Sequence, residues 1–290
     1  MKTKAFIYIV LTGILWGTSG LFVHALAPFG FSSLQMTAMR GVVAAICFLI
    51  YALVRDRNIF KISFFELVLF ALSGIGIFGT ASCYFASMQA SGVSAAVVLM
   101  YTAPIFVMAY SVAFLGEKLT PKKLIAVVFM LIGCILVSGV IGGGSFNFYG
   151  ILLGLMSGIS YSAYNIFTKI QMRRDCNPVS ATLYCFIVMG ALALAVSNPV
   201  QMVHFTMADP TKIIPLIIGI GIFTAVLPYL LYTLALRELP VGTASAMGIV
   251  EPMSACIFSV TLLGEKLAFL PLCGIILILG AVILLSKTSE

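Results

Sequence analysis

Long apolar runs alternate with short polar connections along the whole chain. A helix that crosses a bilayer needs about 20 mostly apolar residues. Ten segments meet this requirement, within a few residues at each end: residues 5–26, 33–54, 64–87, 93–115, 122–141, 148–168, 178–197, 213–235, 241–263 and 269–286. Most connections contain Gly, Pro, Asn or Ser, as turns do, and the longest is a loop near 198–212. The pattern predicts an all-α integral membrane protein with ten transmembrane helices.

Composition supports this prediction. Of the 290 residues, 62% are hydrophobic and 9% are charged, whereas soluble domains carry roughly 25% charged residues. A separate soluble domain would need a long polar segment, and the sequence contains none. The apolar run at the N-terminus is long enough to span and has no small-residue cleavage site after it, so we expect a membrane helix there and not a cleaved signal peptide.

The basic residues predict the orientation. With the N-terminus in the cytoplasm, the inside segments hold Lys2, Lys4, Arg55, Arg57, Lys61, Lys118, Lys122, Lys123, Lys169, Arg173, Arg174, Arg237 and Lys287. The outside loops hold only Lys212 and Lys266. Both termini are therefore predicted to be cytoplasmic. The basic residues behind the net charge of +7 lie mostly in these short loops, where they set the topology. We expect no nucleic-acid partner, because no basic face carries exposed aromatic side chains.

The two halves of the chain resemble each other. Residues 84–119 match residues 232–267 at an offset of 148, with eleven of thirty-six positions identical. The matches include Pro104 with Pro252, each predicted to kink its helix, and both copies of Leu-Gly-Glu-Lys-Leu. Five helices in each half is an odd number, so the halves must insert in opposite senses.

We therefore predict a first five-helix repeat over residues 1–143 and an inverted second one over 144–290, which together form one transmembrane domain. An inverted repeat places the site at a central cavity near the bilayer midplane and lets it open alternately to each side. Gly13-x3-Gly17 and Gly154-x3-Gly158 have the spacing of helix contacts, which lets helices approach closely.

Glu251 stands near the middle of the predicted helix 241–263. A carboxylate at that depth is costly and marks a functional site. It could exchange a proton, because burial favours the neutral form, or it could balance a cationic substrate group. The structural alternative is a carboxyl group that hydrogen-bonds a neighbouring helix where Pro252 interrupts the backbone ladder. Its counterpart in the first half is Ala103, so only one half carries the acid.

Arg40 lies about two turns below the outer end of the predicted helix 33–54. It could hold a substrate carboxylate or pair with an acid. Alternatively, its side chain reaches the outer interface or bonds to carbonyl groups at a helix end.

Trp16, Tyr101 and Tyr161 fall near the middle of predicted helices, although Trp and Tyr usually prefer the membrane interfaces. At this depth they need a hydrogen-bond partner, which a polar cavity would supply, and their rings could cage a quaternary amine. Packing within the bundle is the alternative. Tyr84 and Asn165 are further candidates, and Tyr84, near a predicted helix end, fits a gate or an interfacial belt equally well.

No cofactor or metal is predicted. None of the seven cysteines has CxxC spacing and both histidines are isolated, so a metal site is not expected. The chain has no P-loop, no HExxH and no aspartate within a predicted span, so it is not expected to be an enzyme. Expected partners are a small-molecule substrate and the lipid bilayer, with the protein as a monomer or homodimer. A scaffolding protein would not need an intramembrane acid, and kinked repeats favour a transporter over a channel.

The chain combines ten predicted helices in an inverted repeat, a Trp-Gly in the first helix, and the sequence Pro-x(11)-Gly-Glu-Lys-Leu at the end of the fourth and ninth helices. In these features it resembles the drug/metabolite transporter superfamily, and the EamA type most closely. The resemblance covers essentially the whole chain. It implies a central cavity and export of small metabolites such as amino acids, nucleosides or amines, although some similar proteins import, among them importers of choline. The Arg and Glu-Pro of similar proteins occur here as Arg40 and Glu251-Pro252.

We therefore expect a secondary active transporter of the inner (plasma) membrane that works by alternating access and exports an amino acid or related metabolite. Protons could drive this transport through Glu251. The alternative is transport of an organic cation such as choline or another quaternary amine, caged by Trp16 and Tyr161 and balanced by Glu251.

Overall fold

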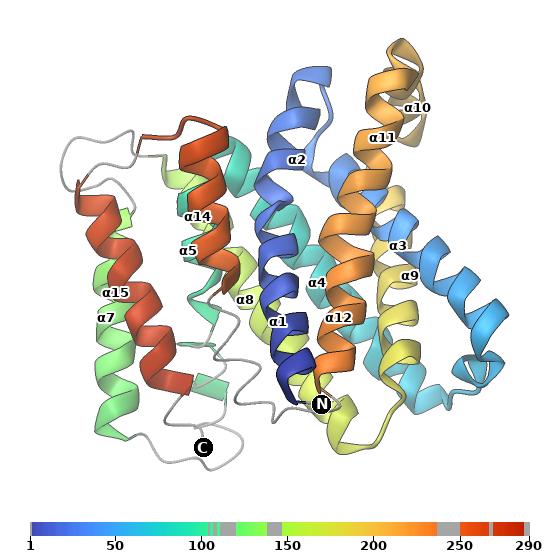
Figure 1. The fold of residues 1–290 in the computed structure, drawn as a ribbon, viewed down its shortest axis with the longest axis horizontal. Coiled ribbons are helices and arrows are strands. Elements are labelled where there is room, and N and C mark those ends of the chain that lie inside the picture. The colour runs from blue at the N-terminus through green and yellow to red at the C-terminus, as the bar shows by residue number, and fades with distance from the viewer. Residues whose placement is uncertain are drawn as a thin grey trace.

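The computed structural model describes residues 2–103, 105–106, 109–110, 120–137, 147–236, 250–266 and 269–286 (Figure 1). Regular structure in these ranges is helical. The α-helices are α1 (Lys2–Gly17), α2 (Ser19–Leu26), α3 (Ser33–Arg55), α4 (Phe64–Ser91), α5 (Val93–Met100), α7 (Pro121–Val137), α8 (Phe148–Arg173), α9 (Pro178–Val196), α10 (Pro199–Ala208), α11 (Pro210–Gly221), α12 (Leu227–Leu236), α14 (Val250–Leu262) and α15 (Phe269–Ser286). Two 3-10 turns, η1 (Ala27–Phe29) and η2 (Arg57–Phe60), and a π-helical turn, η3 (Ile222–Val226), complete the order.

Local sequence explains where several helices begin. Ser32 and Gln35 form a capping box at the start of α3, and Ser63 and Glu66 form another at the start of α4. Each box satisfies backbone N–H groups that the first helical turn leaves unpaired. Three further helices begin with an Asn or Asp side chain as the cap and a proline in the first helical position. These starts are Asn177-Pro178 of α9, Asn198-Pro199 of α10 and Asp209-Pro210 of α11.

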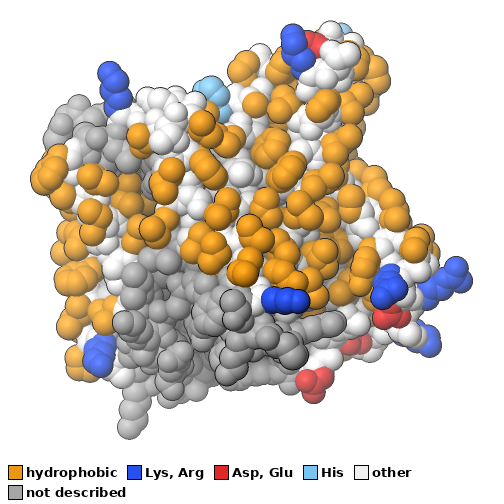
Figure 2. Space-filling model, viewed as in Figure 1, with side chains coloured by type: hydrophobic (Ala, Val, Ile, Leu, Met, Phe, Trp, Pro, Cys, Tyr) orange, Lys and Arg blue, Asp and Glu red, His pale blue; other side chains and the backbone are white. Residues whose placement is uncertain are grey.

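Six helices among the described residues are long and apolar enough to cross a membrane: Ile7–Phe29, Ser33–Arg55, Phe64–Ser91, Phe148–Thr168, Pro178–Val196 and Pro210–Tyr232. Shorter apolar helices run over Met253–Leu262 and Leu272–Ala281. The predicted spans 93–115, 122–141 and 241–263 each extend beyond the described ranges, and α5, α7 and α14 are their described parts. Apolar side chains cover much of the face in Figure 2, with Lys and Arg toward its edges, as expected of a multi-pass membrane protein.

Two local features differ from the predicted elements. The predicted loop near 198–212 contains the helix α10, because Asn198 caps it and Pro199 starts it. The first span is interrupted at Thr18, between α1 and α2, where the Thr18 hydroxyl donates to the Leu15 carbonyl at 2.6 Å. The predicted kink at Pro104 lies outside the described residues, and Pro252 falls within the first turn of α14.

Among the helix pairs that join the two halves of the chain are α3 with α9, α5 with α14 and α7 with α15. The pair α5 and α14 is antiparallel. At one end the Val93 backbone N–H donates to Glu265 Oε1 at 2.6 Å, and at the other the Tyr101 hydroxyl donates to Glu251 Oε2 at 2.9 Å. When the ten predicted spans are numbered along the chain, each of these pairs joins a span of the first half to the span five places later, which is its counterpart in the second half. Moreover, α1 packs on α12 and α14 while α8 packs on α4 and α5, which is the same arrangement with the halves exchanged.

The glycines predicted to lie at helix contacts do lie there. Gly13 and Gly17 of α1 face α14, and Gly154 and Gly158 of α8 face α5 and the turn after it. A Cβ added to Gly13 would lie 2.7 Å from Val250 Cβ, and one added to Gly158 would lie 2.9 Å from Thr102 Oγ1. Val250 and Thr102 are separated by 148 residues, the offset of the sequence repeat. Equivalent positions of the two halves therefore make equivalent close contacts.

Candidate functional site

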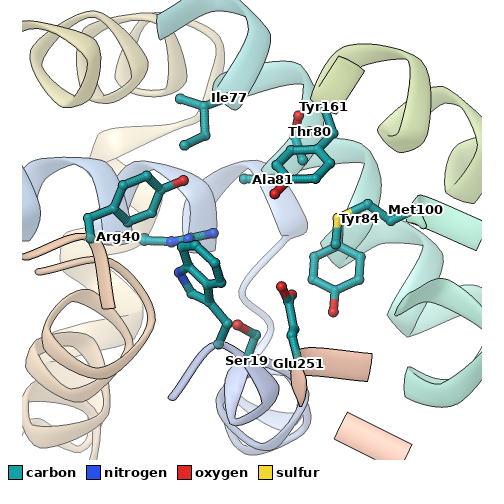
Figure 3. A pocket seen from close by; sticks show the side chains of 11 residues that line it. Ser19, Arg40, Ile77, Thr80, Ala81, Tyr84, Met100, Tyr161 and Glu251 are labelled. Carbon is teal, nitrogen blue, oxygen red and sulfur yellow. The ribbon is translucent and has the colours of Figure 1, made fainter. Parts of the chain in front are cut away.

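A cavity lies beside the break between α1 and α2, enclosed by residues of α3, α4, α5, α8, α12 and α14 (Figure 3). We call it the central cavity. Its lining consists of Trp16, Ser19, Arg40, Ile77, Thr80, Ala81, Tyr84, Met100, Tyr161, Tyr229 and Glu251. Both halves of the chain contribute, and the described lining contains one acidic and one basic side chain, Glu251 and Arg40.

Glu251 belongs to the first turn of α14 and is 6% exposed. Its Oε2 accepts the hydrogen bond from Tyr101, a residue of the other half. Gly13 brings α1 so close that an added Cβ would lie 3.0 Å from the Glu251 backbone nitrogen. The carboxyl group is thus held between two helices and directed toward the central cavity, as Figure 3 shows, and not toward lipid.

Arg40 reaches the cavity from α3 and is 7% exposed, so it does not extend to the outer interface. Its Nη2 donates to the Thr224 carbonyl at 2.7 Å. That carbonyl is available because Pro228, four residues later, has no N–H to donate to it, and the π-helical turn η3 lies at this point. Arg40 therefore makes a hydrogen bond to a backbone carbonyl group, which resembles the structural alternative to a substrate contact given above. Its Nε is buried and has no hydrogen-bond partner among the described residues.

Aromatic rings form one wall of the cavity. Trp16 lies 5.3 Å from Tyr229 and 5.7 Å from Tyr232, measured between ring centroids, and Tyr161 stacks on Tyr164 at 6.1 Å. The Trp16 Nε1 is buried and has no partner among the described residues. Because buried polar groups are normally hydrogen-bonded, two such donors on residues that line one cavity are unusual.

The other predicted site residues have different placements. Tyr101 is buried beside the cavity and contacts it through Glu251. Tyr84 lines the cavity, is 3% exposed and lies two turns before the end of α4, so it does not belong to an interfacial belt. Asn165 is half-buried one turn after Tyr161 on α8 and is not among the lining residues.

Sequence reasoning missed several lining residues. Tyr229 is the most important, since it contacts Trp16, Tyr164 and Phe186. A signal for it existed: it follows Pro228, a proline within a predicted span. Thr80, which stands at the same repeat offset from Pro228, also lines the cavity. Ser19 could have been found from the Gly17-Thr18-Ser19-Gly20 sequence, which weakens the first helix.

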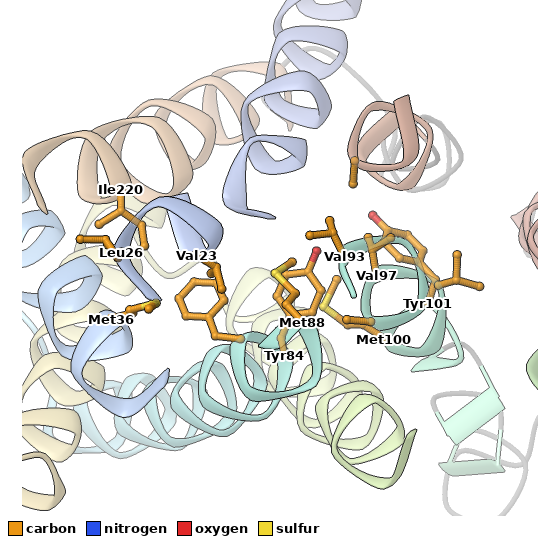
Figure 4. Close-up of a cluster of buried hydrophobic side chains, with 14 of the residues drawn as sticks. Val23, Leu26, Met36, Tyr84, Met88, Val93, Val97, Met100, Tyr101 and Ile220 are labelled. Atoms are coloured by element: carbon orange, nitrogen blue, oxygen red, sulfur yellow. The ribbon is translucent and has the colours of Figure 1, made fainter. Parts of the chain in front are cut away.

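A cluster of buried apolar side chains, drawn in Figure 4, adjoins the cavity through Tyr84 and Met100, which belong to both. It includes Val23, Leu26, Met36, Met88, Val93, Val97 and Ile220, together with Tyr84, Met100 and Tyr101. Along α4 the lining residue Tyr84 is followed by Met88, which belongs to this cluster alone. The cavity is therefore blocked toward the C-terminal end of α4, which the distribution of basic residues predicts to be the outer side.

Known proteins resemble this chain over its whole length. The EamA-like transporter family matches residues 3–139 and again residues 148–287. An uncharacterized transporter of Archaeoglobus fulgidus is 28% identical over 95% of this chain and 94% of its own, and one of Clostridium kluyveri is 25% identical over 99% and 94%. A riboflavin transporter of Brucella anthropi is 29% identical over 46% of each chain. A solved crystal structure shares the fold, with a TM-score of 0.66 at 17% identity and full coverage of both chains.

The fold defines an all-helical, multi-pass membrane protein, and residues of both halves of the chain line its central cavity. The two matches, which together cover nearly the whole chain, place it in the EamA-like transporter family of the drug/metabolite transporter superfamily. The expected resemblance is confirmed. The protein is a membrane transporter, and not an enzyme.

Proposed function

We propose that this protein is a secondary active transporter that moves a small organic solute across the inner (plasma) membrane by alternating access. Residues 1–143 and 144–290 act as inverted halves of five spans each, around the central cavity, with both termini in the cytoplasm. The antiparallel pair α5 and α14 and the equivalent contacts of Gly13 and Gly158 support this arrangement. The leading activity is export of an amino acid or a related metabolite.

The observation that carries this proposal is the set of polar groups in the central cavity. Arg40 Nε and Trp16 Nε1 are buried donors without a partner among the described residues, and the Glu251 carboxyl lies in the same cavity. A zwitterion such as an amino acid matches the two donors and the carboxyl group. Its carboxylate accepts hydrogen bonds from the two donors, and its ammonium group binds Glu251. Protonation of Glu251 would release the ammonium group and couple transport to protons.

A second candidate is transport of an organic cation, favoured by the aromatic wall. The rings of Trp16, Tyr161 and Tyr229 line the same cavity as Glu251, and a quaternary amine binds to such rings by cation–π contact. In this case Arg40 is structural, through its bond to Thr224.

Uptake into proteoliposomes separates these proposals. The panel contains radiolabelled amino acids, choline, nucleosides and, because of the partial relative, riboflavin. Saturable amino-acid transport that Arg40→Ala and Glu251→Gln both abolish supports the first proposal. Choline transport that Trp16→Ala abolishes and Arg40→Lys spares supports the second. Rates equal to those of protein-free liposomes for every solute contradict both.

A further inference from the structure

A second cavity lies next to the central one. Its lining consists of Ser73, Tyr164, Thr168, Gln171, Pro178, Ala181, Thr182, Cys185, Tyr229 and Tyr232. Among the described residues, Tyr229 alone lines both cavities. We call the second cavity the lower chamber.

The lower chamber continues the central cavity along the same helices. On α4 the lining moves from Ile77 to Ser73, one turn earlier. On α8 it moves from Tyr161 to Tyr164 and on to Gln171, a rise of about 15 Å over these ten residues. Because the shift follows the helix axes, the two cavities are stacked along the bundle.

The lower chamber points away from the closed end of the central cavity. It approaches the start of α4 and the end of α8, whereas the apolar cluster lies toward the end of α4. Arg57, Lys61 and Arg174 flank these ends of the helices. They belong to the segments predicted to be cytoplasmic, so the two cavities form a path that is blocked outside and extends inward.

Tyr229 separates the two cavities. Its ring lies 5.0 Å from Phe186, 5.3 Å from Trp16 and 6.5 Å from Tyr164, between centroids. The ring is therefore held among aromatic neighbours from α1, α8 and α9, at the point where one cavity ends and the other begins.

The chemistry of the lower chamber differs from that of the central cavity. Its described lining contains no acidic or basic side chain. The Thr168 and Thr182 hydroxyls donate to carbonyls of their own helices at 2.9 and 2.8 Å, and the Gln171 amide group donates to Leu69 O and Ser73 Oγ at 3.0 and 2.6 Å. These bonds occupy the donors of Thr168, Thr182 and Gln171 and leave their oxygens as acceptors, while the hydroxyls of the lining tyrosines can donate or accept. Acceptors and tyrosine rings suit ammonium or hydroxyl groups, and they provide no charge for an anion.

We infer that the lower chamber is a second solute site on the cytoplasmic side of Tyr229, selective for solutes that donate hydrogen bonds or carry an ammonium group. The inference rests on the proposed transport function. Tyr229 is the partition that a solute must pass to reach Glu251.

Thiol labelling tests this inference. Thr182→Cys, in a protein whose native cysteines are replaced, is treated in inside-out and right-side-out membrane vesicles. The reagents are membrane-impermeant methanethiosulfonates of similar size, one with a trimethylammonium group and one with a sulfonate. Rates are divided by those of each reagent with a free thiol in solution. The control is Ile187→Cys on the same helix, whose native side chain is 40% exposed on the outer surface of the bundle.

We expect Thr182→Cys to react in inside-out vesicles, with the cationic reagent about two- to fivefold faster, the factor of one cation–π contact. Ile187→Cys should not react. Adding Tyr229→Ala to Ala81→Cys, at a position that lines the central cavity, should raise the rate at which that cysteine is labelled in inside-out vesicles. Absence of labelling in well-folded Thr182→Cys and Thr168→Cys, or faster reaction of the sulfonate, would overturn the site, and an unchanged rate in Tyr229→Ala would overturn the partition. Labelling requires no transport, so its failure is distinguishable from a failure in the flux assay.

Discussion

Two glutamates at opposite ends of the α5–α14 contact have different surroundings. Glu265 follows the end of α14, where Gly264 has a φ of +71° and turns the chain back toward α5. Its Oε1 accepts from the first N–H of α5, whose preceding residue, Gly92, supplies no side-chain cap. Glu251 instead accepts from a tyrosine hydroxyl and lines a cavity. The comparison shows that one carboxylate caps a helix by accepting from a backbone N–H, whereas the other accepts from a side chain and faces a cavity.

The largest expected effect comes from Glu251→Gln. The amide can still accept from Tyr101 but can neither release a proton nor balance an ammonium group. We expect the initial rate of uptake in proteoliposomes to fall about 100-fold, the effect typical of losing a positioned proton-transferring group. The matched control is Glu265→Gln in the same assay. If both variants lose the same fraction of activity, the distinction between the two glutamates is wrong.

Gly13→Ala tests the close packing of α1 against the first turn of α14, which carries Glu251. Because the added Cβ would lie 2.7 Å from Val250 Cβ and 3.0 Å from Glu251 N, α14 has to shift. Overpacking of this kind costs about 1–3 kcal/mol, seen as a lower unfolding temperature in detergent. Gly280→Ala on α15 is the control, since nothing lies within 4 Å of its added Cβ. Equal unfolding temperatures for the two variants would argue against the α1–α14 contact.

Tyr101→Phe removes the hydroxyl that bonds Glu251 and retains the ring. Hydrogen bonds between membrane helices contribute about 0.6 kcal/mol on average and up to about 1.7. We therefore expect transport to fall about threefold, with a change in its pH dependence because the carboxyl group loses a partner. Tyr110→Phe, at a tyrosine outside the cavity lining, serves as control. A Tyr101→Phe pH profile identical to that of the original protein would contradict the contact.

Glu265→Gln should have the smallest effect. The amide oxygen can still accept from Val93, while the interaction of the charge with the helix dipole is lost. That interaction is worth about 0.3–1 kcal/mol, so a small decrease in unfolding temperature is expected. A loss as large as that of Gly13→Ala would show that Glu265 does more than cap α5.

The sequence predicts the spans and the acid better than it predicts the walls of the site. Apolar runs indicate the membrane helices directly, and Glu251 is conspicuous because charge is rare at that depth. Tyr229 is not conspicuous, because its role depends on three rings from other helices. The bond from Arg40 to Thr224 also requires the structure, since it depends on a carbonyl freed by Pro228 in a distant segment. The sequence predicts a loop where the helix α10 lies, because its 10 residues are too few to form a membrane span.

Counterflow tests alternating access most directly. Proteoliposomes loaded with an excess of an unlabelled solute from the transported panel are diluted into a trace of the same radiolabelled solute. The account predicts that label accumulates transiently above its equilibrium level, because each site that releases unlabelled solute outside the liposome returns to the lumen with label, and that Tyr229→Ala reduces this overshoot. Label that rises only to equilibrium, as through a channel, would contradict it.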